Sequence, residues 1–301
     1  MASTFPAISV IIAHFGADED ARTLLKETIA SVRAQDYPGT VEVAVADDGS
    51  PWSAALRTRG SQPVTCRDRS HPLLKDLDPD LLVTGGVPEV FGKSRMLNAT
   101  LAATTGPLVV LLDDDHPFLG HRALSAYARY LARYAFVMGR IINGDGSIRS
   151  PLHGMVQGSN LGVRRSLLKE AGGFEERCAQ WGCGDDPALF WRIYQVIGTA
   201  TPKQAVFAGD ILTRDRRTGR WHGMADDARF VEGFREAYGV NPHHNPCRDF
   251  SQWMDYGRCS SPAIEYGVRL HNRLRRAIAP KASVLARALG LPPHPGPWSR
   301  P

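Results

Sequence analysis

The sequence predicts an α/β fold with a central, mainly parallel β-sheet flanked by helices. Short apolar runs alternate along the chain with segments in which apolar residues recur at helical spacing, and this alternation is typical of parallel sheets with helical crossovers. Two of the runs end directly in acidic residues, at the edge where α/β sheets bind ligands. With 301 residues, of which 43% are hydrophobic and 22% charged, the chain can bury a substantial core and is neither disordered nor a coiled coil.

The first part of the chain predicts a strand, a helix and a second strand. Ile8–Ile12 is a β-branched run that is typical of a buried parallel strand. Apolar residues then recur at helical spacing from Leu24 to Val32, and Val41–Ala46 is a second apolar run. This order and length suit a right-handed crossover.

The segment between residues 60 and 92 is irregular and rich in proline, with room for two short strands near 64–66 and 81–84. A helix over 92–105 leads to Leu108–Leu112, the most apolar run in the chain. The other predicted elements are helices at 121–134, 166–171 and 185–196, a strand at 135–142, loops at 143–160 and 209–230, and a basic amphipathic helix at 264–291, or a helix pair interrupted by Pro280.

Several classes of protein are disfavoured. No uninterrupted apolar stretch reaches the roughly 18–20 residues of a membrane-spanning helix, and Met1–Pro6 lacks the basic region of a signal peptide. The five cysteines include no C-x2-C pair, which argues against a disulfide framework or a zinc ribbon. Dinucleotide-binding, P-loop and G-x-S-x-G motifs are absent from the sequence. We expect a cytoplasmic protein.

The net charge of +5 is concentrated at the C-terminal end. Residues 264–301 hold seven Lys or Arg and one acid, so the rest of the chain is close to neutral. This distribution gives no reason to expect nucleic-acid binding. The tail could lie on an anionic membrane surface, or it could pack on the core with its arginines outward, and both interpretations stay open.

Three consecutive carboxylates, Asp113, Asp114 and Asp115, follow the most apolar strand. Adjacent acids repel one another unless a cation or a proton intervenes. Mg²⁺ and Mn²⁺ prefer carboxylate oxygens and leave coordination positions open for phosphate. The pattern therefore predicts a metal that bridges this strand end to a diphosphate; the alternative is a solvated acidic turn.

Two further acidic pairs mark candidate sites. Asp47 and Asp48 end the second strand, where a carboxylate can accept hydrogen bonds from a base N–H or from ribose hydroxyls; the alternative is a turn or a helix cap. Asp185 and Asp186 begin a predicted helix, where they could supply a general base or simply be stabilised by the helix dipole. The ring of Trp181, just before them, is expected to pack near a ligand.

A histidine in a polar segment, His222, could complete the coordination of a metal as a neutral imidazole. A structural role is the alternative. His243, His244 and Cys247 also lie close together in the sequence, but their spacing matches no common metal site.

Taken in this order, the motifs resemble those of the inverting family 2 glycosyltransferases, which have the type A (GT-A) nucleotide-diphospho-sugar transferase fold. The resemblance spans residues 8 to about 225. It departs from the family pattern at Ala13, Phe15, Gly16 and Asp185, where Pro, Tyr, Asn and Glu are usual. The matching segments are Ile8–Gly16 (V-S-V-I-I-P-x-Y-N), Ser31–Gln35 (S-x-x-x-Q), Glu42–Ser50 (E-V-I-V-V-D-D-G-S), Gly92–Ala99 (G-K-x-x-A-L-N-x), Leu112–Asp115 (D-x-D), and Gly172–Glu176 with Trp181–Asp186 (G-G-F-D-E and W-G-x-G-E-D, an element shared with galactosyltransferase-like enzymes).

The resemblance implies a catalytic domain over residues 1–260, with a nucleotide-binding half at about 1–115 and an acceptor half at about 116–260, and a basic helical extension with a Pro-rich tail at 261–301. It implies that a hexosyl or N-acetylhexosaminyl group moves, with inversion, from a nucleotide-diphosphate sugar to an acceptor hydroxyl. A UDP-sugar is the first expectation for the donor, and Mn²⁺ or Mg²⁺ for the cofactor. Such a bacterial enzyme is expected in the cytoplasm, and peripheral contact of the basic C-terminal helix with the inner face of the membrane is the open alternative for the tail.

The resemblance also implies roles for individual residues. Asp186 is the expected base, with Asp185 as the alternative. The expected metal ligands are Asp113, Asp115 and His222. The residues expected at the nucleotide sugar are Ala13, Phe15, Asp47, Asp48, Lys93, Arg95, Asn98, Asp113, Asp114 and Trp181.

Two other functions stay open. A nucleotidyltransferase also uses a metal and a nucleotide on a related sheet, but it would carry a Gly-rich basic loop after the first strand, where His14–Asp20 is acidic. A non-catalytic sugar-binding or scaffold protein would have no need for acids in all three clusters.

Overall fold

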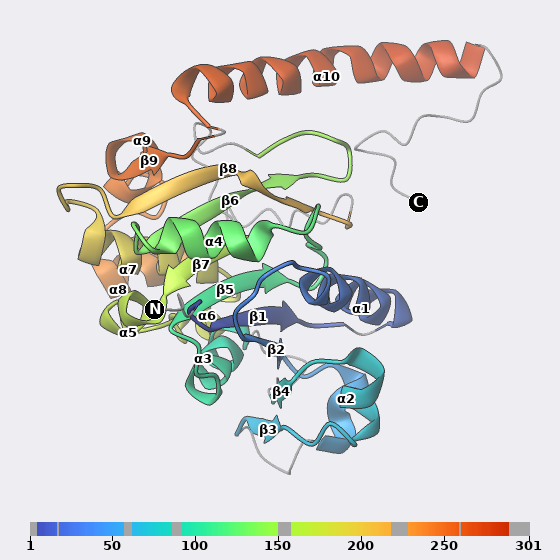
Figure 1. Ribbon diagram of the computed structural model, residues 1–301. Helices are drawn as coiled ribbons and strands as arrows, with labels where there is room; N and C mark the ends of the chain where they lie inside the picture. Colours follow the sequence, from blue (N-terminus) through green and yellow to red (C-terminus); the bar gives the residue numbers. More distant parts are fainter. Residues whose placement is uncertain are drawn as a thin grey trace.

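The computed structural model describes residues 5–16, 18–56, 62–85, 92–149, 158–217, 228–258 and 260–288. Within these ranges the strands form one nine-stranded sheet in the order β3-β4-β2-β1-β5-β7-β6-β8-β9, with helices on both faces (Figure 1). Most neighbouring strands are parallel, which confirms the predicted α/β class with a mainly parallel sheet and a helical C-terminal extension.

The strands are β1 (Ile8–His14), β2 (Val41–Asp47), β3 (Val64–Cys66), β4 (Leu81–Thr84), β5 (Leu108–Asp113), β6 (Phe136–Ile142), β7 (Leu161–Arg164), β8 (Ala205–Arg214) and β9 (Met254–Tyr256). The α-helices are α1 (Glu19–Arg33), α2 (Pro72–Leu77), α3 (Lys93–Ala103), α4 (Ala123–Leu131), α5 (Arg165–Glu170), α6 (Cys178–Trp181), α7 (Asp185–Ile197), α8 (Ala228–Tyr238), α9 (Phe250–Trp253) and α10 (Pro262–Ala288).

The sheet separates two hydrophobic cores, and strand β1 contributes to both. Ile8, Val10 and Ile12 pack on the face covered by α1 and α4. Ile11 and Ala13 pack on the opposite face, against side chains of α3 and α7. Because both faces are buried, the strand reads as a continuous apolar run rather than as an alternating one, which explains why it was recognisable in the sequence.

The second half of the sheet departs from the predicted pattern. Strand β7 is short and runs antiparallel to both β5 and β6. The prediction of a loop over 209–230 is wrong at both ends, because residues 209–214 complete β8 and residues 228–230 begin α8. The polar character of β8 has a structural cause: Asp210 accepts a hydrogen bond from Tyr130 and pairs with Arg129, each at 2.8 Å.

The described part of the C-terminal extension forms a single helix, α10, rather than a pair interrupted at Pro280. It runs along one side of the molecule, beyond the last strands of the sheet (Figure 1). No helix in the described part of the chain has the length and hydropathy that crossing a bilayer requires.

Candidate functional site

The candidate site lies where the chain reverses its direction of travel across the sheet. From β1 the chain goes to β2 and β4 on one side, and from β4 it returns to β5 on the other side of β1. In open α/β sheets such a switch point leaves a crevice at the carboxyl ends of the two central strands. Strands β1 and β5 are parallel neighbours, with Ala13 opposite Asp113 in the register. The acidic residues at the end of β5 therefore lie at this crevice.

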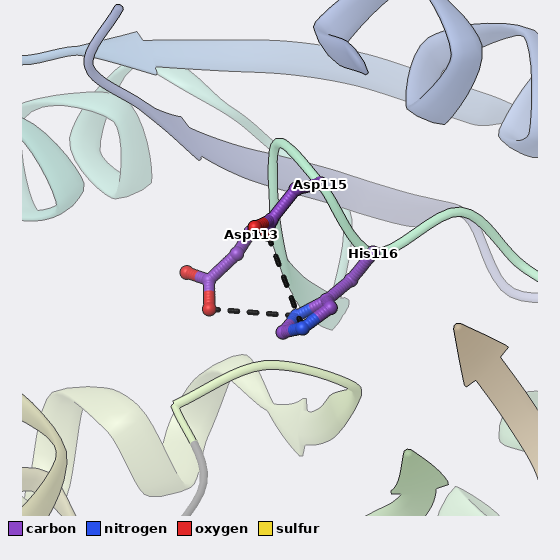
Figure 2. A group of neighbouring side chains, drawn as sticks. All are labelled: Asp113, Asp115 and His116. Atoms are coloured by element: carbon purple, nitrogen blue, oxygen red, sulfur yellow. Dashed lines mark ion pairs between the residues drawn. The ribbon is translucent and has the colours of Figure 1, made fainter. Parts of the chain in front are cut away.

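Two carboxylates and one imidazole converge at the end of β5. Figure 2 shows Asp113, Asp115 and His116 pointing toward one another from a single turn. Each offers one ligand atom, and these atoms all lie within 4.8 Å of one another. The imidazole Nδ1 is 3.5 Å from the nearer oxygen of Asp113, and Nε2 is 3.9 Å from Asp115. Oxygen and imidazole donors at this spacing could hold a divalent cation.

The segment that follows β8 lies along this turn and brings a further acid to it. The backbone N–H groups of Arg214 and Arg216 donate to the carbonyls of Pro117 and Asp115, at 3.1 and 3.0 Å. These bonds place the carboxylate of Asp215 at the turn. Nothing in the sequence pattern links residues 113–116 to residues 214–216, so this neighbour comes from the tertiary fold.

The ring of His116 is almost completely buried, with 4% of the residue exposed. Neither ring nitrogen has a hydrogen-bond partner within the described part of the chain, although Nε2 lies 3.7 Å from Asp215. Burial alone would lower the pKa of His116, but Asp215, Asp113 and Asp115 outweigh it and raise the pKa. A buried imidazole surrounded by carboxylates without short bonds to them is consistent with a site for a cation.

Basic side chains surround the acidic turn. Lys93, at the start of α3, places its Nζ 3.2 Å from Asp113, and Arg217 lies 3.2 Å from Asp114 and 3.8 Å from Asp115. Burial is the main cause that raises the pKa of Asp115 to about 6. Burial acts in the same direction on Asp113, but Lys93 and His116 outweigh it and hold the pKa of Asp113 below its usual value.

The middle carboxylate of the run has protein partners of its own. Asp114 is 4% exposed, and its Oδ2 is 2.5 Å from Nδ1 of His14. The indole of Trp52 donates to the other ring nitrogen of His14 at 3.2 Å. Since an indole N–H only donates, that nitrogen accepts, and Nδ1 therefore carries the proton that bonds to Asp114. The turn is thus fixed to the end of β1.

The second acidic pair begins α7. Gly184 precedes it with φ +96°, and a Cβ there would meet the ring of Phe230, so only glycine fits this entry to the helix. Asp185 is 5% exposed and lies 3.0 Å from Nζ of Lys93. One ammonium group therefore contacts both acidic clusters, Asp113 on one side and Asp185 on the other.

Asp186 is half-buried and lines a small pocket together with Ala13, Lys93 and Asp185. Burial and the neighbouring Asp185 carboxylate raise the pKa of Asp186 well above its usual value, and Lys93 offsets them only in part. The two carboxylates of this pair thus differ: Asp185 is tied to an ammonium group, whereas Asp186 has a high proton affinity and faces the pocket.

The two acids at the end of β2 also differ. Asp47 is fully buried and accepts hydrogen bonds from the backbone N–H of Ser50 and the hydroxyls of Ser53 and Thr84, so both its oxygens are used within the protein. Asp48 accepts from the backbone N–H of Gly92 through Oδ2 at 2.8 Å. Its Oδ1 is buried without a partner in the described ranges.

The environment of Asp48 favours its neutral form. Burial raises the pKa of Asp48 to about 6, and the hydrogen bond from Gly92 and the charges of Arg95 and Lys93 oppose that rise. Arg95, half-buried on α3, thus lies beside the end of β2. At the end of β2, Oδ1 of Asp48 is thus buried without a hydrogen-bond partner among the described residues, and Arg95 lies near it.

Two residues expected at the nucleotide sugar also make structural contacts. Asn98 bonds to both the N–H and the carbonyl of Phe174, at 2.8 and 3.0 Å, and so fixes α3 to the 172–176 turn. Trp181 is 6% exposed because its ring packs against Phe230 and Phe234 of α8. Little of the indole face is therefore left for a sugar.

Phe15 follows β1 directly and is 46% exposed. His222 lies outside the described residues. The sequence reasoning missed His116, Asp215 and Arg149, which pairs with Asp215 at 2.7 Å. His116 could have been found, because it adjoins the triple acid in the sequence, but the other two sit in segments predicted as loops.

No protein-family model matches the chain. An N-acetylglucosaminyltransferase of Rhizobium meliloti (strain 1021) is 32% identical to it over 111 residues, which are 36% of this chain and 22% of that protein. The match thus spans about a fifth of the curated relative's length.

Solved structures resemble nearly the whole chain. The mannosyltransferase PcManGT from Pyrobaculum calidifontis, in complex with GDP-Man and Mn²⁺, covers 95% of this chain and 76% of its own, with a TM-score of 0.53 and 19% identity. S. aureus TarS 1-349, in complex with UDP-GlcNAc, covers 93% and 77%, with a TM-score of 0.55 and 14% identity. The chain therefore has the α/β fold that these glycosyltransferase structures share.

Proposed function

We propose that the protein is a metal-dependent, inverting glycosyltransferase that moves a sugar from a nucleotide-diphosphate sugar to an acceptor hydroxyl. The observation that carries the proposal is the meeting of two unlike acidic clusters at one switch point. Asp113, Asp115 and His116 have the donor set of a divalent cation, and Asp186 has the high proton affinity of a base. Lys93 lies between the clusters, at 3.2 and 3.0 Å from one carboxylate of each.

A divalent cation fits the residues at the end of β5. His116 is buried, neither ring nitrogen has a hydrogen-bond partner among the described residues, and two carboxylates face the ring at 3.5 and 3.9 Å. Asp113, Asp115 and His116 would hold the cation, which when bound would supply charge stabilisation for the departing nucleoside diphosphate. Carboxylate oxygens suit Mn²⁺ or Mg²⁺, and an imidazole donor favours the transition metal Mn²⁺ over Mg²⁺. His222 remains a candidate further ligand.

Asp186 is the proposed general base. The acceptor hydroxyl would give its proton to the Asp186 carboxylate as its oxygen attacks the anomeric carbon, and the bond from that carbon to the diphosphate oxygen would break. A base of high proton affinity suits this step, and a single displacement inverts the anomeric carbon. Asp185 lines the same pocket and forms an ion pair with Lys93.

Asp48 is the proposed contact to the nucleoside. Its unpartnered Oδ1 can accept a hydrogen bond from a base N–H or a ribose hydroxyl, whereas the oxygens of Asp47 are already used. Lys93, Arg95 and Arg217 are positioned to offset the charge of a diphosphate. The nucleotide sugars named with the two solved glycosyltransferases support a donor of this chemical class.

Thermal unfolding with a panel of donors tests this function. UDP-, GDP- and dTDP-sugars would be added with and without Mn²⁺ to the wild type and to Asp115→Asn. We expect one nucleotide class to stabilise the wild type only when Mn²⁺ is present, by about 3 kcal/mol when the ligand is at a hundred times its Kd. Asp115→Asn should lose this gain, because Asp115 is a proposed metal ligand.

The matched control is Glu236→Gln, which neutralises an exposed carboxylate on α8. It should respond to donor and metal as the wild type does. A donor that stabilises Asp115→Asn as much as the wild type would contradict the proposed metal dependence. If no nucleotide sugar binds while Mn²⁺ does, the donor class is wrong and nucleotidyl transfer becomes the better hypothesis.

A further inference from the structure

Helix α10 is attached to the body of the protein through polar side chains. Glu265 is fully buried and pairs with Arg140 of β6, and Ser260 donates to the same carboxylate at 2.6 Å. About two turns further along the helix, Asn272 is 5% exposed and bonds to both the N–H and the carbonyl of Ile148, at 3.0 and 2.7 Å. These two residues lie seven positions apart, so they share one face of the helix.

The apolar side chains of the same helix face outward. Tyr266, Leu270 and Leu274 are 64%, 50% and 52% exposed. Their spacing of four residues aligns them in one stripe along α10. A helix that merely packs on a core turns its apolar stripe inward. Here the inward face holds Glu265 and Asn272, and the described residues leave the stripe exposed.

Basic side chains border this stripe. Arg269 and Arg273, both exposed, each lie one residue before a leucine of the stripe. Glu265 is the single acid among residues 262–274, and it is buried against Arg140, so the described outer face of the helix carries no negative charge. In the sequence, residues 264–301 contain seven Lys or Arg and that one acid.

We propose that the outer face of α10 binds the surface of an anionic lipid bilayer, with the helix lying in the plane of the interface. An apolar stripe with arginines along its edge fits such a surface. The stripe can enter the boundary between head groups and acyl chains, and the guanidinium groups can meet the anionic head groups. A second copy of this chain is a poorer fit, because it would bring the same unneutralised arginines against the stripe. The proposal does not depend on the transferase activity proposed above.

Co-sedimentation of the full-length protein with vesicles tests the proposal. One set of vesicles is phosphatidylcholine alone, and the other contains about one third phosphatidylglycerol, both at low and at high salt. We expect binding to the anionic vesicles that falls by more than about tenfold in phosphatidylcholine or at high salt.

Two variants separate the parts of the surface. The triple variant Tyr266→Ser, Leu270→Ser and Leu274→Ser should bind anionic vesicles at least about tenfold more weakly, because it removes the apolar stripe. The pair Arg269→Gln and Arg273→Gln should lose a similar amount and part of the salt dependence. Since these side chains are exposed, thermal unfolding of both variants should match the wild type.

The matched control is Phe5→Ser, which removes an aromatic side chain that is 52% exposed at the other end of the chain. It should bind vesicles as the wild type does. Failure of the wild type to bind anionic vesicles, equal binding to both lipid mixtures, or unchanged binding of the triple variant would each overturn the proposal. Sedimentation equilibrium adds a fourth test: a wild-type dimer that the triple variant dissociates would assign the face to a second copy instead.

Discussion

Two acidic clusters meet at the candidate site, and their surroundings differ. At the end of β5, Asp113 and Asp115 face a buried imidazole from two sides. At the start of α7, Asp185 is held by Lys93, and Asp186 is left with a strongly raised pKa. All four of these acids are aspartates, so the residue type by itself does not separate a metal ligand from a base.

The neighbours of a carboxylate decide its chemistry. A carboxylate whose pKa is held below its usual value by cations, as at Asp113, stays ionised and suits a metal ion. A carboxylate that shares a buried position with a second acid, as at Asp186, binds a proton tightly and suits proton transfer. Lys93 contacts both acidic clusters. Substitutions in the two clusters should therefore affect different properties, namely Mn²⁺ affinity at the end of β5 and turnover at the start of α7.

The largest expected effect is that of Asp186→Asn. Loss of the proposed base should lower kcat by about a hundredfold to ten-thousandfold, with Mn²⁺ affinity and donor affinity nearly unchanged. The amide carries no charge, so the variant should be at least as stable as the wild type in urea unfolding. Asp185→Asn is the matched control: it leaves Lys93 without one of its partners and should reduce stability. An Asp186→Asn enzyme with wild-type turnover would place the base elsewhere.

A smaller effect is expected at His116, where substitution tests whether the ring is a metal ligand or only a counter-ion to the carboxylates. We expect His116→Gln to weaken Mn²⁺ binding by more than about tenfold in isothermal titration, because one of three proposed donors is replaced. Asp215→Asn, which changes a neighbour of the ring 3.7 Å away, should have a smaller effect. Equal Mn²⁺ affinity in His116→Gln and the wild type would show that the ring only balances charge.

Lys93→Met should move metal binding and turnover in opposite directions. The ammonium group is 3.2 Å from Asp113 and competes there with a metal, so its removal should tighten Mn²⁺ binding by about three- to tenfold. Turnover should fall, because the diphosphate and Asp185 both lose a cation. Weaker Mn²⁺ binding in Lys93→Met would indicate that the lysine organises the metal site rather than competing for it.

The fold was predictable where single segments carry their own signal. Strands β1, β2 and β5 are largely buried, so each is visible in the sequence as an apolar run, and the acids at the ends of β2 and β5 mark the carboxyl edge of the sheet. Strand β8 was missed because Asp210 and Arg214 make it look like a loop, and pairing with β6 overrides that local preference.

The site was predictable by residue type but not by role. Nothing local distinguishes Asp47 from Asp48, and only Ser53 and Thr84, brought in by the fold, use up the oxygens of Asp47. Trp181 has the sequence context of an aromatic platform, but α8 covers its ring. Roles that depend on which side chains a distant segment supplies need the tertiary structure.

The smallest expected effect is at Asp48, where stability and binding should change in opposite directions. The pKa of Asp48 is raised from 3.8 to about 6, so the folded state binds this proton more tightly than the unfolded chain. The contribution of this carboxyl to stability should therefore be greatest below about pH 4 and should fall as the pH rises through 6, by at most about 3 kcal/mol. Asp48→Asn keeps an acceptor for the N–H of Gly92 and has no charge to bury.

The variant should thus equal the wild type near pH 4 and exceed it at pH 7.5 in urea unfolding followed against pH. Donor affinity should meanwhile fall by about tenfold, because an amide oxygen is a weaker acceptor than a carboxylate. A carboxylate that costs stability at neutral pH and improves donor binding is maintained for its ligand. If Asp48→Asn gains no stability at pH 7.5, the carboxylate is not desolvated as described, and its unpartnered oxygen would no longer support a nucleoside contact.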